Sequence, residues 1–218
     1  MIGLAGSAMA LGRSAMGKRP QERPNVLFIA VDDLRPQLGC YGEKWMKSPN
    51  IDRLAASGVT FSRHYVTTPT CGASRYSLLT GLRPKRAPDL INQAFASNQK
   101  ALSGNEVESF PHLFKQHGYT TVAIGKITHK INGSGGELRR SWTEARPVPM
   151  KRSLRKGRLA FETPDVADEG YSDGLIAARA IKKLQELKDK PFLLAVGFLK
   201  PHLPFNSPKR YWDMYNAD

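Results

Sequence analysis

Residues 25–33 read NVLFIAVDD, a continuous apolar run between Pro24 and the carboxylates Asp32 and Asp33. A run of this length, rich in branched side chains and without alternation, is typical of a strand buried on both faces of a parallel sheet. Residues 191–198 (PFLLAVGF) repeat the pattern, and residues 119–124 predict a third strand. The sequence therefore predicts a parallel sheet that contains at least these three strands.

Helix start and stop signals alternate with the predicted strands. The expected helical segments are 48–56, 71–79, 109–118 and a helix capped by Ser172 and Asp173. A further strand is expected over 59–65, and the polar, basic, Gly- and Pro-rich residues 132–164 are expected to form a long excursion outside the sheet. This order predicts an α/β fold with a mostly parallel central sheet flanked by helices.

The length of 218 residues and the hydrophobic content of 40% indicate one globular domain, and no apolar run is long enough to cross a bilayer. Residues 1–24 differ in composition from the rest and are expected to form an N-terminal tail. Within this tail, residues 8–10 (AMA) resemble a signal-peptidase site, so a periplasmic or extracellular location is expected. Residues 25–218 are expected to form the folded unit.

The formal net charge of +14 indicates an anionic partner or anionic surroundings. Half of this charge lies between residues 139 and 158, where eight basic residues stand against Glu144 alone. The eight are Arg139, Arg140, Arg146, Lys151, Arg152, Arg155, Lys156 and Arg158. A sulfated polysaccharide fits this charge, and a solvated basic loop is the alternative. No interleaved aromatic and basic pattern indicates nucleic acid, which is not expected as a partner.

Polar residues follow each predicted strand at the point where it ends. Asp32 and Asp33 follow the first strand, Lys126 follows the middle one, and Lys200 and His202 follow the last. Because the carboxyl ends of parallel strands meet at one edge of a sheet, we expect one shared site there.

Two adjacent carboxylates at a strand end can both reach a hard divalent cation. Asp32 and Asp33 are therefore candidate ligands for Ca²⁺, with Mg²⁺ as the alternative, and a turn or helix-capping role is the competing interpretation. The sequence shows no cluster of His and Cys that indicates zinc.

Residues 70–75 read TCGASR and lie at a predicted helix start, where backbone N–H groups and the helix dipole favour anions. Arg75, one turn after Cys71, can offer planar donors to the same region. From this position alone Cys71 is either a buried, inert thiol or a nucleophile.

Two Lys–His pairs accompany this cysteine: Lys126 with His129, and Lys200 with His202. A lysine can bind a sulfate oxygen, and a histidine can hydrogen-bond a nucleophile or protonate a leaving alcohol. Each pair follows a predicted buried strand, so both are candidates for the shared site rather than surface decoration.

Taken together, these segments resemble a type I (formylglycine-dependent) sulfatase of the alkaline-phosphatase superfamily, in its iduronate-2-sulfatase-like branch. The resemblance is carried by residues 25–41, 48–54, 71–84, 125–129 and 192–205. It runs from about residue 24 to residue 218 and covers the N-terminal part of such a catalytic domain.

The resemblance implies a role for each matching residue. Cys71 is oxidised to formylglycine by a maturation enzyme that reads C-x-A-x-R, and it then serves as nucleophile and metal ligand. Asp32 and Asp33 ligate the divalent cation, and Arg75 steadies the nucleophile. Ala73 stands where the commonest form of this signature has Pro.

The remaining matches concern the sulfate group. Lys126 and His202 hold its oxygens, His129 supports the nucleophile and helps to release sulfate from the sulfated intermediate, and Lys200 is a weaker sulfate contact. The implied activity is removal of sulfate from a sulfated sugar or polysaccharide. The later half of the family domain supplies an Asp-His or Asp-Asn metal pair and another lysine, which have no counterpart in these 218 residues.

Two other functions compete with a sulfatase. One is a phosphatase or phosphonate hydrolase of the same superfamily, although its members generally use Ser or Thr without the C-x-A-x-R context. The other is a non-catalytic basic module that binds sulfated glycan.

Overall fold

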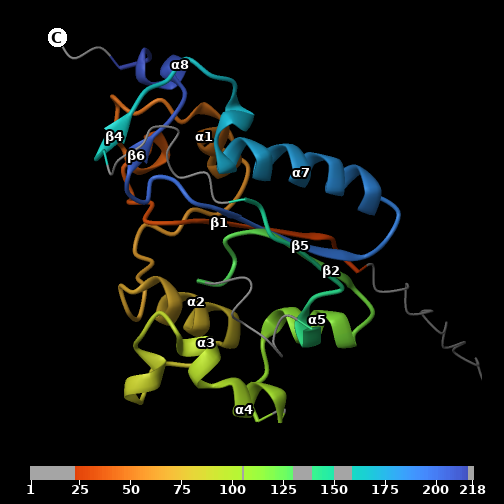
Figure 1. The fold of residues 1–218 in the computed structure, drawn as a ribbon. Coiled ribbons are helices and arrows are strands. Elements are labelled where there is room, and N and C mark those ends of the chain that lie inside the picture. Colours follow the sequence, from red (N-terminus) through yellow and green to blue (C-terminus); the bar gives the residue numbers. More distant parts are fainter. Residues whose placement is uncertain (1–22, 105, 130–138, 150–158, 216–218) are drawn as a thin grey trace, which may run out of the picture.

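The computed structural model describes residues 23–104, 106–129, 139–149 and 159–215 (Figure 1). Most of the expected N-terminal tail, with its signal-like pattern, lies outside the described residues, as do residues 132–138 and 150–158 of the basic excursion. The α-helices are α1 (Pro49–Ala56), α2 (Cys71–Thr80), α3 (Ala94–Ser97), α4 (Gln99–Ser103), α5 (Phe110–Gln116), α7 (Ser172–Leu187) and α8 (Lys209–Trp212). The strands are β1 (Val26–Val31), β2 (Thr120–Gly125), β3 (Glu144–Arg146), β4 (Phe161–Glu162), β5 (Phe192–Phe198) and β6 (Phe205–Asn206).

Four strands form a parallel sheet in the order β1-β5-β2-β3. The strand β5 lies between β1 and β2, so Leu193 is opposite Val26 on one side and Thr121 on the other. The apolar runs at residues 26–31, 120–125 and 192–198 thus lie side by side and point the same way. This arrangement confirms the predicted α/β fold with a mostly parallel central sheet.

Helices cover both faces of the sheet, with α7 on one face and α2 to α5 on the other (Figure 1). Alternate residues of β5 pack against the helices on the two faces, because successive side chains of a strand point to opposite faces. Leu193 belongs to the core cluster that contains Tyr76 of α2. Leu194 belongs to the cluster that contains Ile176 and Ala180 of α7. Both clusters end at the carboxyl edge of the sheet, where they support the site.

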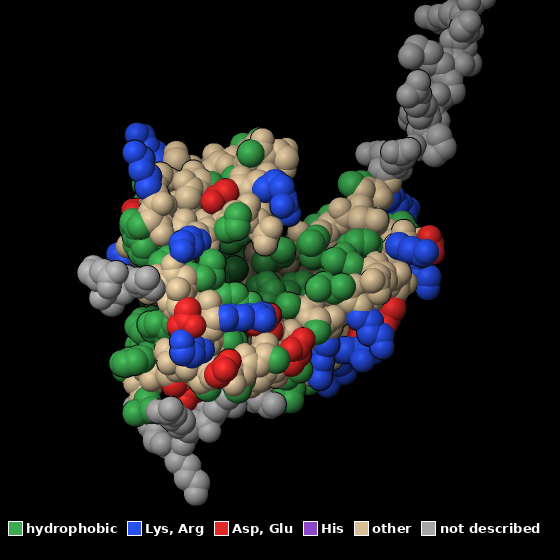
Figure 2. All heavy atoms as spheres, turned by 90° about the horizontal axis from the view of Figure 1, so that it is seen from above, with side chains coloured by type: hydrophobic (Ala, Val, Ile, Leu, Met, Phe, Trp, Pro, Cys, Tyr) green, Lys and Arg blue, Asp and Glu red, His purple; other side chains and the backbone are tan. Residues whose placement is uncertain are grey.

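The prediction that β1 is buried on both faces is wrong. Leu27 and Ile29 are 46% and 49% exposed, and they lie on the face where α7 packs over β5 and β2. In the described part of the chain β1 is an edge strand, beyond the reach of α7. Figure 2 shows a hollow on one face of the molecule with hydrophobic side chains on its floor. Apolar composition alone cannot distinguish a central strand from an edge strand.

Two further predictions need correction. Part of the basic excursion enters the sheet, because β3 pairs with β2, and β4 pairs with β6 in a second, two-stranded sheet. The polar β3 is possible because it is a three-residue edge strand with partly exposed side chains. Residues 59–65 form no strand, and Val59 and Tyr65 are 82% and 79% exposed.

The expected caps of α7 also differ from what the structure shows. Neither Ser172 nor Asp173 caps the helix, whose N-cap is Tyr171. Ser172 donates its hydroxyl to the carbonyl of Pro149, and Asp173 contacts the segment after β5. Among the residues described, no helix has the length and apolarity needed to cross a membrane.

Candidate functional site at the carboxyl edge of the sheet

The site begins at Asp32, the residue directly after β1. Its backbone N–H donates to the carbonyl of Phe198 at 3.1 Å, so Asp32 continues the ladder between β1 and β5. The carboxylate is 4% exposed and accepts hydrogen bonds from Arg75, at 2.9 Å, and from Lys126. One buried carboxylate therefore connects β1, α2 and the segment after β2.

The helix α2 begins at Cys71 itself, after Thr70 in an extended conformation. The N–H of Gly72 donates to Asn92 Oδ1 at 3.0 Å, so a side chain 20 residues away satisfies one of the free donors of the helix start. A Cβ at Gly72 would lie 2.1 Å from the carbonyl oxygen of Asn92. Glycine is therefore required next to Cys71 for the two segments to approach.

Arg75 connects α2 to the segments that follow β1 and β2. Its Nη1 donates to the carbonyls of Lys126 and Ile127, the latter at 3.2 Å, while Nη2 donates to Asp32. The residue is 7% exposed, so its charge is held inside the protein. This geometry fixes the position of α2, and with it Cys71, against the ends of β1 and β2.

Lys126 lies between the carboxylate and the cysteine. Its Nζ is bonded to Asp32 and lies 3.8 Å from Cys71 Sγ. The preceding residue, Gly125, has φ of 75°, and a Cβ there would lie 2.3 Å from the carbonyl oxygen of Gly197. Only glycine permits this turn and this approach, which bring the lysine back over the sheet edge.

Burial and charge set the acidity of these groups in opposite directions. Burial opposes ionisation of Asp32, but hydrogen bonds from Lys126 and Arg75 outweigh it and hold its pKa below the ordinary value. Burial raises the pKa of the Cys71 thiol; the charge of Lys126 opposes this rise, and Asp32 and Asp33 add to it. The unmodified cysteine is thus a weakly acidic thiol rather than an activated thiolate.

His202 reaches the same place from the turn after β5. One ligand atom each of Asp32, Cys71 and His202 lie within 4.8 Å of one another. This grouping of one carboxylate, one thiol and one imidazole joins three segments that are far apart in sequence. His202 Nδ1 lies 2.6 Å from the carbonyl oxygen of Leu203. A carbonyl can only accept, so Nδ1 donates to Leu203, and Nε2 is the ring nitrogen that remains to face a ligand.

The other expected site residues lie around this centre. Asp33 is exposed and lines an open cleft of about 490 Å³ together with Asp32, Cys71 and Arg75. His129 is half-buried, three residues beyond Lys126 in the segment that follows β2, and its role stays a prediction.

Lys200 lies in the segment after β5, and its role as a sulfate contact stays a prediction. Its Nζ donates to the carbonyl of His202 at 3.0 Å and to that of Pro204. These bonds make Lys200 part of the turn that carries His202.

Two residues that hold the site were not recognised from sequence: Asn92, for which no local signal exists, and Asp173, which has the pattern of a helix cap.

The carboxylate oxygens of the site are the type of ligand that a hard divalent cation prefers. Asp32 and Asp33 supply carboxylate oxygens on one wall of the cleft, and Ca²⁺ prefers six to eight oxygen ligands. Each oxygen of Asp32 already accepts one hydrogen bond, and each keeps a further lone pair. A zinc ion within the Asp32–Cys71–His202 group is less suited, because the group offers one thiol and one imidazole, whereas zinc sites commonly hold at least two His or two Cys ligands.

The fold and site define a class of protein: a parallel α/β protein whose candidate centre lies beyond the carboxyl ends of its strands. The family follows from comparison with known sequences. The sulfatase family model matches residues 24–218, so the chain belongs to the sulfatase family. It is 34% identical over 232 aligned residues to mouse iduronate 2-sulfatase, covering 97% of this chain and 41% of the mouse protein. The chain spans about two fifths of the length of the curated relatives it matches first.

Solved structures agree on the fold. Phosphonate monoester hydrolase of Agrobacterium radiobacter aligns with a TM-score of 0.71 at 24% identity, over 89% of this chain and 44% of that one. BT4656, solved in complex with its substrate D-glucosamine-2-N,6-O-disulfate, aligns with a TM-score of 0.57 at 26% identity, over 84% of this chain and 35% of that one. The sheet and its flanking helices therefore have the same fold as these solved structures.

Proposed function

We propose that this chain forms the nucleophile-bearing part of a sulfuric ester hydrolase that removes sulfate from a sulfated sugar or polysaccharide. The observation that carries the proposal is the convergence of Asp32, Cys71, Lys126 and His202 from four segments at the carboxyl edge of the sheet. Family membership supports sulfate as the group transferred. The names of relatives, which include iduronate 2-sulfatase and a protein bound to D-glucosamine-2-N,6-O-disulfate, support a sugar as its carrier.

The chain's own residues bind and orient an anionic sulfate ester. Lys126 offers a buried ammonium beside residue 71, and the N-terminus of α2 adds backbone donors. His202 contributes through its imidazole, with Nδ1 fixed by Leu203. Arg75 holds these groups in place through Asp32 and the carbonyls of Lys126 and Ile127, which follow β2, and we assign it no direct contact with sulfate.

Residue 71 and a divalent cation complete the proposed chemistry. We infer that a maturation enzyme, using an external oxidant, converts the CH₂SH of Cys71 to the CHO of formylglycine with loss of the sulfur atom. One hydroxyl of its hydrate attacks the ester sulfur, the S–O bond to the sugar breaks, and the protonated alcohol leaves. Deprotonation of the second hydroxyl then restores the aldehyde and releases sulfate. Asp32, Asp33 and residue 71 would hold Ca²⁺, or Mg²⁺ as the alternative, which supplies positive charge next to the sulfate oxygens. His129 is proposed to support residue 71. A periplasmic or extracellular location is also proposed.

Mass spectrometry of the peptide around residue 71 tests the nucleophile. After co-expression with a maturation enzyme, that peptide should be about 18 Da lighter, because CH₂SH is replaced by CHO. Cys40→Ser is the matched control, since Cys40 is the other free cysteine, and it should leave the modification unchanged. An unmodified thiol at residue 71 would contradict the mechanism. Faster hydrolysis of an aryl phosphate than of an aryl sulfate by the modified chain would favour a phosphatase instead.

A further inference from the structure

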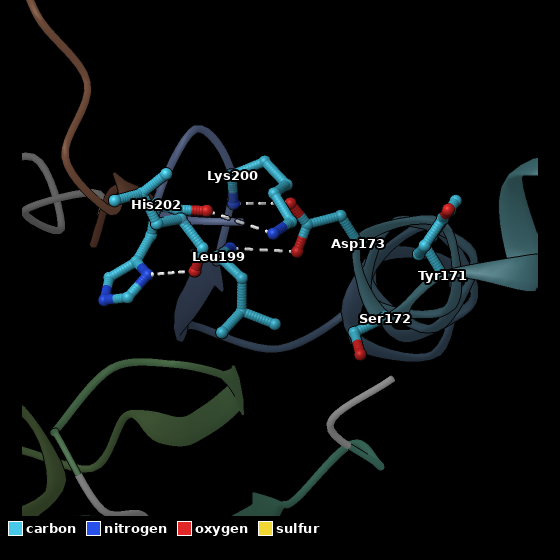
Figure 3. Close-up of a pocket in the computed structure, with 7 residues that line it drawn as sticks. Tyr171, Ser172, Asp173, Leu199, Lys200 and His202 are labelled. Carbon is cyan, nitrogen blue, oxygen red and sulfur yellow. Dashed lines mark hydrogen bonds between the residues drawn. The ribbon is translucent and has the colours of Figure 1, made fainter. Parts of the chain in front are cut away.

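The side chain of Asp173 connects the start of α7 to the segment after β5. Its Oδ1 accepts the N–H of Leu199 at 2.9 Å, and its Oδ2 accepts the N–H of Lys200 at 2.8 Å (Figure 3). The bonds span 26 and 27 residues of sequence, so they are tertiary contacts and not a helix cap. Both oxygens of one carboxylate are therefore used to hold two consecutive backbone N–H groups.

These two N–H groups begin the turn that carries His202. Within the turn, the carbonyl of Leu199 accepts the N–H of His202 at 3.0 Å, and Lys200 Nζ donates to the carbonyl of His202. The imidazole is then fixed by the bond from Nδ1 to Leu203. Figure 3 shows Asp173 on one side of this turn and the imidazole of His202 on the other. Fixing the first two residues of the turn thus fixes where the imidazole lies.

We propose that Asp173 is a positioning residue of the site, which acts through the Leu199–Lys200 backbone to hold His202 next to Cys71 and Asp32. The inference rests on the proposed function only where sulfate binding is concerned. The positioning role itself does not depend on the proposed function, because Asp173 lies on α7, outside the cleft, and acts on the backbone.

A carboxylate is the suitable group for this task. Each of its oxygens can accept an N–H, whereas an amide offers one acceptor and would turn its NH₂ donor towards the second N–H. Burial raises the pKa of Asp173; the N–H groups of Leu199 and Lys200 and the charge of Lys200 lower it, and the charge of Asp32 raises it. Burial outweighs these donors, so the pKa of Asp173 lies above its ordinary value. The geometry, in which each oxygen accepts one backbone N–H, is what assigns the role.

The test compares Asp173→Asn with the matched control Glu186→Gln. Both remove one carboxylate from α7, but Glu186 pairs with Lys183 at the other end of the helix. The primary readout is NMR of the 218-residue chain: the amide signals of Leu199 and Lys200 and the imidazole signals of His202. Asp173→Asn should shift all three and reduce the exchange protection of both amides by about tenfold, since one charge-assisted bond is lost. Glu186→Gln should leave them in place.

The second readout is the binding of inorganic sulfate, measured by calorimetry in a double-mutant cycle. Asp173→Asn should weaken sulfate binding by about tenfold in the unsubstituted chain but by less than about twofold in a His202→Ala background, because its effect passes through His202. Equal losses in both backgrounds would overturn the proposal, as would unchanged His202 signals accompanied only by a lower melting temperature. A chain whose His202 signals respond to Asp173→Asn but which binds no sulfate would support the positioning role and contradict the proposed function.

Discussion

Lys126 and Cys71 are 55 residues apart in sequence, yet the Nζ atom of the lysine lies 3.8 Å from the sulfur. The ammonium is the nearest favourable charge for a thiolate that burial otherwise disfavours. The acidity of Cys71 in the unmodified chain therefore reports directly on this contact. It can be measured without a substrate, a metal ion or the maturation step.

Lys126→Met should raise the pKa of the Cys71 thiol further, because it removes the largest charge that opposes burial. In a Cys40→Ser background, alkylation of Cys71 by iodoacetamide at neutral pH should become about tenfold slower, as expected for a shift of about one pKa unit. Lys115→Met is the control, since Lys115 on α5 donates to the carbonyls of Arg139 and Trp142, away from Cys71. An unchanged alkylation rate in Lys126→Met would show that the lysine does not influence the acidity of Cys71.

Asp32→Asn should strongly destabilise the fold, because it leaves Arg75 and Lys126 buried against a neutral amide. Removing one partner of a buried ion pair typically costs about 3–5 kcal/mol in the free energy of unfolding. Asp33→Asn is a matched control one residue away, since Asp33 is exposed and Asn accepts its φ of 55°. That control should stay within about 0.5 kcal/mol. Urea denaturation of both variants gives the comparison, and equal losses would show that the ion cluster does not stabilise the fold.

The stabilisation from Asp32 should depend on pH in a defined direction. Its pKa is lower in the folded protein than the ordinary value of 3.8, so folding favours the carboxylate. The contribution is complete above the unfolded value and is lost as pH falls through the lower folded value. The difference in unfolding free energy between the unsubstituted chain and Asp32→Asn should therefore be constant above about pH 5 and shrink at lower pH. A difference that grows on acidification would contradict the ion pairs.

Much of this site could be predicted because its signals are local. Asp32, Lys126 and His202 each follow an apolar run, and parallel strands place their carboxyl ends at one edge. The helix start at Cys71 was visible in the same way, from a small polar segment followed by an apolar turn and a glycine.

The remaining features depend on neighbours that no local pattern records. The exposure of Leu27 and Ile29 depends on how far α7 extends across the sheet. The inclusion of β3 in the sheet depends on β2 having an edge at which another strand can pair. Asp173 has the sequence of a helix cap, and only the path of the chain after β5 reveals its real partners. Long-range hydrogen bonds of this kind leave no periodicity.

Two glycines of similar backbone conformation can test whether the close contact between the ends of β2 and β5, next to Lys126, stabilises the fold. Gly81 and Gly125 have φ of 71° and 75°, so alanine at either position carries the left-handed penalty of about 1–2 kcal/mol. A Cβ at Gly81 meets nothing within 4 Å, whereas at Gly125 it would lie 2.3 Å from the carbonyl oxygen of Gly197. Gly125→Ala should therefore cost about 1–3 kcal/mol more than Gly81→Ala in urea denaturation.

The same pair of variants separates the fold from the site. Because Gly125 directly precedes Lys126, the backbone shift that Gly125→Ala forces should move the ammonium away from Cys71 and slow its alkylation, as in Lys126→Met. Gly81→Ala lies at the far end of α2 and should leave the alkylation rate unchanged. If Gly125→Ala lowers stability but preserves the thiol's reactivity, the glycine is needed for strand packing and not for the placement of Lys126.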